Sequence, residues 1–156
     1  ALSAVERLRA AMPDVQLTTD MIVGFPGETE EEFAESAEFA RRAGFLHIHV
    51  FPYSKREGTP AATMKDQVPE AIKHDRVAVL SRISEGTCGA ILDRVLAHPA
   101  PLTVLPETRG EGFVMAHTPD FLEVKILTDC PLPREEFTVL PIRREGEILI
   151  CSPAEA

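Results

Sequence analysis

The sequence predicts an α/β unit followed by a small β-barrel. Helical and strand patterns alternate through residues 1–97, and five short strand patterns separated by turn residues fill residues 100–151. Between these parts stand Pro99 and Pro101, which stop a helix and stiffen a short connection. We therefore expect one domain over residues 1–97 and a second over residues 98–156.

Composition and charge exclude several classes of protein. Of the 156 residues, 44% are apolar, which is too many for a disordered chain. The net charge of −9 is unlike that of a protein that grips nucleic acid by charge alone. No apolar run approaches the roughly 18–20 residues of a membrane helix, and the three cysteines form no CxxC pair. We expect a cytoplasmic protein and, because the chain begins with Ala1, a piece of a longer one.

The first domain opens with a short amphipathic helix over residues 4–11, which Pro13 ends. The strand that follows, residues 17–23, lacks a clean polar and apolar alternation toward its end, as is typical of a buried parallel strand. Thr29 and Glu32 then have the spacing of a capping box, which predicts a helix start.

Gly44 is expected to end this helix, and residues 45–51 form the next strand. Pro69 opens a long helix that runs to about residue 97. Its apolar positions near helical spacing are Ile72, Val79, Leu80, Ile83, Ile91 and Val95. Two strands leave open sheet edges, so this half is expected to be part of a larger barrel or sheet, or to pair two chains through those edges.

The second domain contains five short strands in about fifty residues, which is typical of a small OB-like barrel. Turn residues such as Gly112 and Pro119 separate them. The expected strands are 102–105, 112–117, 121–127, 137–142 and 147–151.

Two loops follow the predicted parallel strands, at the end where β/α folds bind ligands. Gly24–Thr29 joins a strand to a helix start, and it is equally consistent with an ordinary turn and cap. Phe51–Ala61 combines Tyr53 with Lys55 and Arg56, which favours a surface for a nucleotide over a merely ordered loop.

Three further features have a functional and a structural interpretation. His47 and His49 share one face of a strand and could bind zinc, but a cavity lined by two hydrogen-bonded histidines is favoured because no third ligand is evident. Lys125, Arg143 and Arg144 could bind RNA, or they could be solvated charges among ten acidic residues. The cysteines receive no catalytic role: Cys88 is expected in the core, and Cys130 and Cys151 among turn and edge residues.

Three motifs in a fixed order point to one family. They are TDMIVGFPGET at residues 19–29, HVFPYSKREGTPAA at residues 49–62, and Gln67–Pro69 with Arg76. In these segments the chain resembles the radical-SAM methylthiotransferases, most of all the MtaB-like branch that acts on threonylcarbamoyladenosine in tRNA. The MiaB and RimO branches are close relatives. Residues 112–126, GFVMAHTPDFLEVKI, resemble the family's TRAM domain.

The resemblance implies the C-terminal part of such an enzyme, with a partial radical-SAM β/α barrel followed by an OB-like TRAM domain. The whole enzyme would methylthiolate C2 of N6-threonylcarbamoyladenosine beside the anticodon of tRNA, using S-adenosylmethionine (SAM) and two [4Fe–4S] clusters. No cysteine of this chain matches a cluster ligand of the family. We therefore expect this chain alone to hold no metal or cofactor and to be inactive.

The resemblance also suggests site residues, without assigning a catalytic residue or a metal ligand. The expected cofactor-binding residues are Ile22, Val23, Gly24, Glu28, Phe51, Tyr53 and Ser54. The expected RNA or substrate contacts are Lys55, Arg56, Lys125, Arg143 and Arg144.

Three alternatives remain open from the sequence. A ribosomal-protein methylthiotransferase of the RimO-like branch would suit an acidic TRAM domain, because its substrate is basic. A non-catalytic RNA-binding module would need only the TRAM domain. A zinc hydrolase would use His47 and His49.

Overall fold

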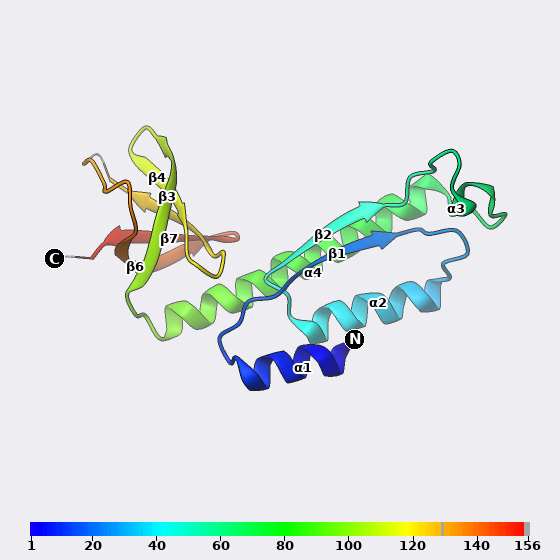
Figure 1. Cartoon of the computed structure of the whole chain (residues 1–156), viewed down its shortest axis with the longest axis horizontal. Helices are drawn as coiled ribbons and strands as arrows, with labels where there is room; N and C mark the ends of the chain where they lie inside the picture. Colours follow the sequence, from blue (N-terminus) through cyan, green and yellow to red (C-terminus); the bar gives the residue numbers. More distant parts are fainter. Residues whose placement is uncertain (129, 155–156) are drawn as a thin grey trace. The chain divides into compact units, whose positions relative to one another are not determined.

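The computed structural model describes residues 1–128 and 130–154 (Figure 1). The chain divides into two compact units, Ala1–Thr87 and Cys88–Ala156. The last turns of the long helix therefore belong to the second unit. The domain boundary expected after residue 97 stays a prediction. No helix in the described ranges is long and apolar enough to cross a membrane.

The first unit holds a two-stranded parallel sheet (Figure 1). The strands pair in register from Thr18 opposite His47 to Val23 opposite Pro52, so both end at the same edge. This edge carries the two predicted ligand-binding loops. The elements are α1 (Leu2–Ala11), β1 (Thr18–Val23), α2 (Glu30–Ala43), β2 (His47–Pro52), α3 (Pro60–Thr63), and α4 (Glu70–Ala97), which continues into the second unit. The sequence did not predict the single turn α3.

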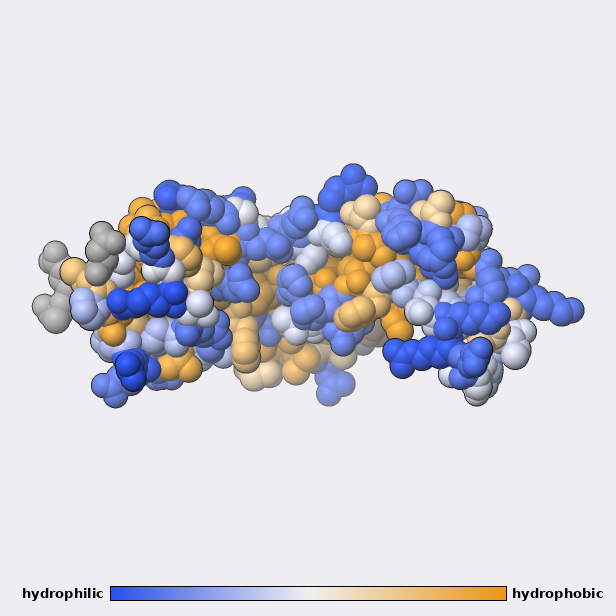
Figure 2. All heavy atoms as spheres, turned by 90° about the horizontal axis from the view of Figure 1, so that it is seen from above, coloured by the Kyte–Doolittle hydropathy of each residue, from blue (hydrophilic) through white to orange (hydrophobic). Residues whose placement is uncertain are grey.

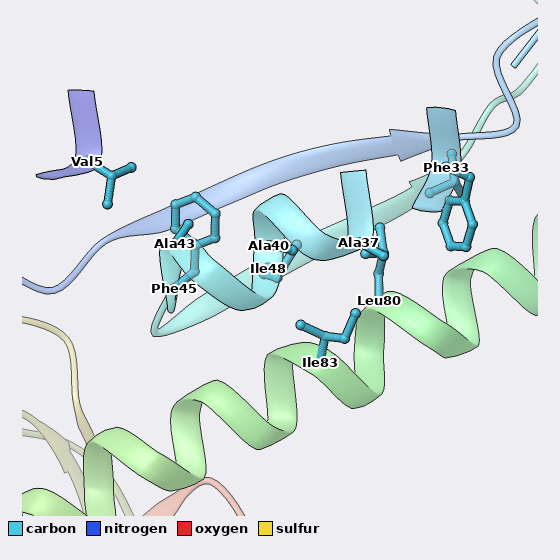
Figure 3. Close-up of a cluster of buried hydrophobic side chains, with 10 residues drawn as sticks. Val5, Phe33, Ala37, Ala40, Ala43, Phe45, Ile48, Leu80 and Ile83 are labelled. Atoms are coloured by element: carbon cyan, nitrogen blue, oxygen red, sulfur yellow. The ribbon is translucent and has the colours of Figure 1, made fainter. Parts of the chain in front are cut away.

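One face of this sheet packs against helices and the other face is open. Ile48 of β2 is buried together with residues of α2 and α4, and Figure 3 shows Leu80 and Ile83 of α4 pointing toward α2 and the strands. The core comprises Val5, Val23, Phe33, Ala37, Ala40, Ala43, Phe45, Ile48, Leu80 and Ile83. On the opposite face His47, His49 and Phe51 are exposed. The favoured interpretation of His47 and His49, a cavity that they line, was wrong for the described residues, because both side chains are exposed.

Both predicted ends of α2 are confirmed. Thr29 Oγ1 accepts a hydrogen bond from the Glu32 N–H at 3.2 Å, and Glu32 Oε2 accepts one from the Thr29 N–H at 2.9 Å. Gly44 closes the helix in the left-handed conformation at φ 58°. The cap fixes where α2 begins, and thus how many residues separate it from β1.

We expect Thr29→Ala to lower the free energy of unfolding by about 1 kcal/mol, because two N–H groups at the helix start lose their partner or its alignment. Urea unfolding measures the loss. Thr59→Ala is the matched control, since Thr59 begins α3 without a side-chain cap bond. Equal losses in both variants would show that the cap bonds contribute nothing specific.

The first turns of α4 differ from the prediction. Ile72, expected on the buried stripe, is 36% exposed, whereas Lys73 and Arg76 are each only 4% exposed. Leu80, Ile83 and Ile91 are buried as predicted. The polar pair is buried because the loops at the sheet edge supply hydrogen-bond partners for it, and helical periodicity does not record such partners.

The second unit contains the five predicted strands, closed into a barrel in the order β3-β4-β5-β7-β6. All neighbouring pairs are antiparallel except β5 and β7, which run parallel. This five-stranded mixed ring is consistent with a TRAM-like β domain. Its strands are β3 (Leu102–Gly110), β4 (Phe113–His117), β5 (Glu123–Leu127), β6 (Phe137–Glu145) and β7 (Ile148–Pro153).

Cys151 lies in the barrel and not at its edge, so that expectation was wrong. It is 1% exposed in β7 and pairs with Ile126 on one side and Pro141 on the other. Closure of the ring makes β7 an interior strand, which its late position in the chain did not suggest. Cys88 is buried, as predicted.

Candidate functional site

The candidate site lies where β1 and β2 end, on the open face of the sheet. Ile22 and Phe51 are neighbours across the strands and are 61% and 51% exposed. They therefore form an apolar layer that no described residue covers. On the face that Figure 2 draws, hydrophobic side chains reach the surface between hydrophilic ones. A flat apolar ligand would bury this layer.

The predicted cofactor-binding residues take different roles at this edge. Val23 is 1% exposed and faces the helices, so it can offer a ligand only its main chain. The main chains of the two strands meet here, because the Tyr53 N–H donates to the Val23 carbonyl at 2.8 Å. Ser54 is exposed beyond the end of β2.

Glu28 is held inside the loop after β1. Its Oε2 accepts a hydrogen bond from the Gly24 N–H at 2.6 Å and forms an ion pair with Arg76, and its side chain is 14% exposed. Arg76 also binds Glu30 at 2.6 Å. Burial lowers the pKa of Arg76, but hydrogen bonds to Glu30 and Glu28 outweigh that effect and raise it. Glu28 thus shapes the loop main chain that a ligand would meet.

The predicted histidine pair is close but incomplete as a metal site. The rings of His47 and His49 are 4.5 Å apart, edge to face. Within residues 1–128 and 130–154 no group of three His, Cys, Asp or Glu side chains is placed to hold a metal ion. The zinc interpretation thus lacks a third ligand among these residues.

Comparison with known proteins finds homologues among the tRNA methylthiotransferases. No protein-family model matches the chain. The threonylcarbamoyladenosine tRNA methylthiotransferase MtaB of Bacillus subtilis is 40% identical over 123 residues, which cover 77% of this chain and 27% of that protein. This chain is homologous to the C-terminal portion of the tRNA methylthiotransferases.

Other methylthiotransferases match over shorter stretches. The tRNA-2-methylthio-N(6)-dimethylallyladenosine synthase of a Nocardioides species is 53% identical over 87 residues, covering 53% of this chain and 18% of its own. The corresponding synthase of Lachnoclostridium phytofermentans is 52% identical over 75 residues, which cover 48% of this chain and 16% of that protein. The chain spans about a quarter or less of the length of these relatives.

The cysteines of this methylthiotransferase homologue do not fit an iron–sulfur cluster. Cys88 and Cys151 are buried, and burial raises the pKa of each thiol to about 11. A carboxylate, Glu147, adds to the effect at Cys88. Cluster ligands must be thiolates. Among the described residues, moreover, no group of three His, Cys, Asp or Glu side chains is placed to hold a metal ion.

These pKa values predict selective labelling. At pH 8 iodoacetamide should modify Cys130, which is exposed, while Cys88 and Cys151 remain unmodified. With a pKa of about 11, on the order of one molecule in a thousand carries either thiolate at that pH. Intact-mass spectrometry should count one adduct in native protein and three in urea. Rapid labelling of Cys151 in native protein would contradict the closed barrel.

The apolar layer at the strand ends fits the adenosyl part of SAM better than the cysteines fit an iron–sulfur cluster. Ile22 and Phe51 offer an uncovered apolar surface. The Tyr53 hydroxyl is buried and has no hydrogen-bond partner in residues 1–128 and 130–154, so one polar group there is unsatisfied. Of these two features, the uncovered apolar surface is the one that a flat adenosyl group would complement.

The predicted RNA contacts divide into two kinds. Lys55 and Arg56 are exposed in the loop after β2. In the barrel, Arg144 binds Asp93 at 2.7 Å and lowers the pKa of that carboxyl, and Arg143 pairs with Glu145. Lys125 lies over the Phe113 ring, with Nζ 4.6 Å from its centroid. The two arginines would have to leave carboxylates to bind phosphate.

Sequence reasoning missed two residues of functional interest. Lys73 is buried beside the strand ends. Phe121 is 71% exposed, stacks on His117 with the ring centroids 5.6 Å apart, and has a φ of 66°, which is uncommon for a residue with a side chain. Pro119 and Asp120 marked a turn there, but a turn signal does not show which side chain it exposes.

Proposed function

We propose that this chain is the part of a radical-SAM methylthiotransferase that completes the β/α barrel and adds the TRAM domain. The whole enzyme would methylthiolate C2 of N6-threonylcarbamoyladenosine beside the anticodon of tRNA, in the cytoplasm. The observation that carries this proposal is the 123-residue similarity to MtaB. That stretch is longer than either compact unit, so it includes parts of both. The two dimethylallyladenosine synthases match only 87 and 75 residues.

In this proposal, residues at the ends of β1 and β2 bind the adenosyl group. Ile22 and Phe51 contact the base through apolar surface, and the main chain at Val23 and Gly24 borders it. Glu28 keeps that main chain in shape through its bond to the Gly24 N–H. SAM, when bound, supplies the methyl group and the reductive cleavage chemistry of the reaction. The chain's own part is to bind, orient and exclude water.

Contacts to RNA would come from two surfaces. Lys55 and Arg56 follow β2 directly, so they can reach a substrate placed over the strand ends. In the barrel, the exposed Phe121 offers a ring on which an unpaired base can stack. The barrel part, residues 98–156, carries five basic and ten acidic side chains, so we expect its own affinity for RNA to be weak and to depend on stacking.

Deleting the gene and quantifying the nucleosides of total tRNA by mass spectrometry tests the function. We expect the methylthio form of threonylcarbamoyladenosine to disappear and its unthiolated precursor to rise. Reintroducing the wild-type gene should restore the methylthio form. Loss of the methylthio form of dimethylallyladenosine would reassign the substrate. If no tRNA nucleoside changes, mass spectrometry of the ribosomal proteins decides whether a protein is the substrate.

A further inference from the structure

Lys73 of α4 is the buried residue that links the two strand ends. Its side chain is 5% exposed. Nζ donates to the Tyr53 carbonyl at 3.0 Å and to Glu70 Oε1 at 2.7 Å. This second bond lowers the pKa of Glu70. A buried lysine is costly unless it is paired, and here one of its partners is the main chain at the end of β2.

The same side chain packs against the end of β1. A Cβ added at Gly24 would lie 2.4 Å from Lys73 Cγ, which is closer than atoms can approach. Gly24 also has a φ of 71°, where a residue with a side chain is strained. The lysine stem therefore occupies the space that a side chain at position 24 would need. A larger residue at position 24 would therefore clash with the side chain of Lys73.

Lys73 also determines where the Tyr53 ring lies. Nζ is 5.4 Å from the centroid of that ring, and the Phe25 ring packs edge to face against it at 5.3 Å. The ring is thus held on two sides, while its hydroxyl is buried without a partner in the described part of the chain. The hydroxyl makes no bond to these described residues that would hold the ring, so the place of the ring depends on Lys73 and Phe25.

We propose that Lys73 is a positioning residue for the adenosyl site, holding Tyr53 and the Gly24 main chain where the ligand meets them. This inference rests on the proposed function, because the ligand is SAM. Lys73 itself is buried beneath the site and touches no ligand.

The first test is Lys73→Met in the natural protein that contains this chain. Methionine keeps most of the stem but cannot donate to Tyr53. We expect the Kd for SAM, measured by equilibrium dialysis with labelled SAM, to rise about tenfold or more, as the loss of one good hydrogen bond to a placed group implies. The KM for SAM should rise more than kcat falls. Lys65→Met, at an exposed lysine of the same unit, is the matched control and should bind as wild type.

The second test is Tyr53→Phe, which separates binding from folding. Removing a hydroxyl that has no partner among the described residues should leave the urea unfolding midpoint of the free protein unchanged or raise it. The same variant should bind SAM with the wild-type Kd, because the ring and the Tyr53 carbonyl that Lys73 holds are both kept.

The outcomes distinguish this inference from the function on which it rests. If the wild-type protein does not bind SAM at all, the proposed function fails. If wild type binds SAM and Lys73→Met binds it equally well, the positioning role is wrong, whatever the variant does to stability. If Tyr53→Phe loses as much affinity for SAM as Lys73→Met, the contacts of Lys73 are not what places the ligand, and the positioning role is wrong as well.

Discussion

Arg76→Met is expected to lower the free energy of unfolding of the first unit by about 3–5 kcal/mol, since it leaves the Glu28 carboxylate, 14% exposed, without its charged partner. Arg76 also donates to the Glu28 carbonyl at 3.3 Å, and its guanidinium lies over the Phe33 ring. One side chain therefore connects α4, the loop after β1 and the start of α2. The ion pair of Arg76 with Glu30 stabilises the unit less than the pair with Glu28, because the Glu30 side chain is 73% exposed.

Urea unfolding, followed together with hydrogen exchange of the β1 and β2 amides, measures this effect. Arg82→Met is the matched control, because Arg82 is an exposed arginine of the same helix. We expect it to change the free energy of unfolding by no more than about 0.5 kcal/mol. Similar losses in the two variants would show that the buried pair adds no more than an exposed arginine does.

The second large effect is expected in the barrel. Leu149→Ala should lower the free energy of unfolding of the second unit by about 2–5 kcal/mol, because it removes a fully buried side chain and leaves a cavity. Leu149 lies in β7, in register with Val124 on one side and Arg144 on the other. In the closed ring, β7 lies between β5 and β6.

Hydrogen exchange of the amides in β5, β6 and β7 reports this loss within the barrel. Leu127→Ala serves as the control, since Leu127 is 49% exposed on β5. Leu127→Ala should lower the free energy of unfolding much less than Leu149→Ala does, because the Leu127 side chain buries little apolar surface on folding. If β7 exchanged as slowly in Leu149→Ala as in wild type, the closed ring would be the wrong description of this unit.

Local patterns predicted most of the elements correctly. Thr29 and Glu32 indicated the start of α2, and Gly44 its end, because the groups that bond or adopt the required backbone angle lie within a few residues. The same holds for the two parallel strands and the five strands of the barrel. For the candidate site, the order of elements placed the ends of β1 and β2 together, since parallel strands end at one edge.

Local patterns failed where the partners are distant in the chain. The periodicity of α4 favoured Ile72 for the interior, but Lys73 is buried there because the Tyr53 carbonyl lies 20 residues away in the chain and 3.0 Å away in space. The cofactor contact expected of Glu28 stays a prediction, but no pattern indicated that its carboxylate also meets Arg76, 48 residues later. No spacing rule covers such separations.

The sequence by itself determined the two kinds of fold, the helix caps, the sheet edge that carries the candidate site, and the resemblance to methylthiotransferases. Only the tertiary structure decided that Lys73 and Arg76 are buried, that Cys151 lies inside a closed barrel, and that the Tyr53 hydroxyl has no partner among the described residues. The physical reason is the range of the forces involved. Backbone hydrogen bonding and periodic burial act between near neighbours, whereas a buried charge or hydroxyl depends on whichever distant groups the fold brings within about 3 Å.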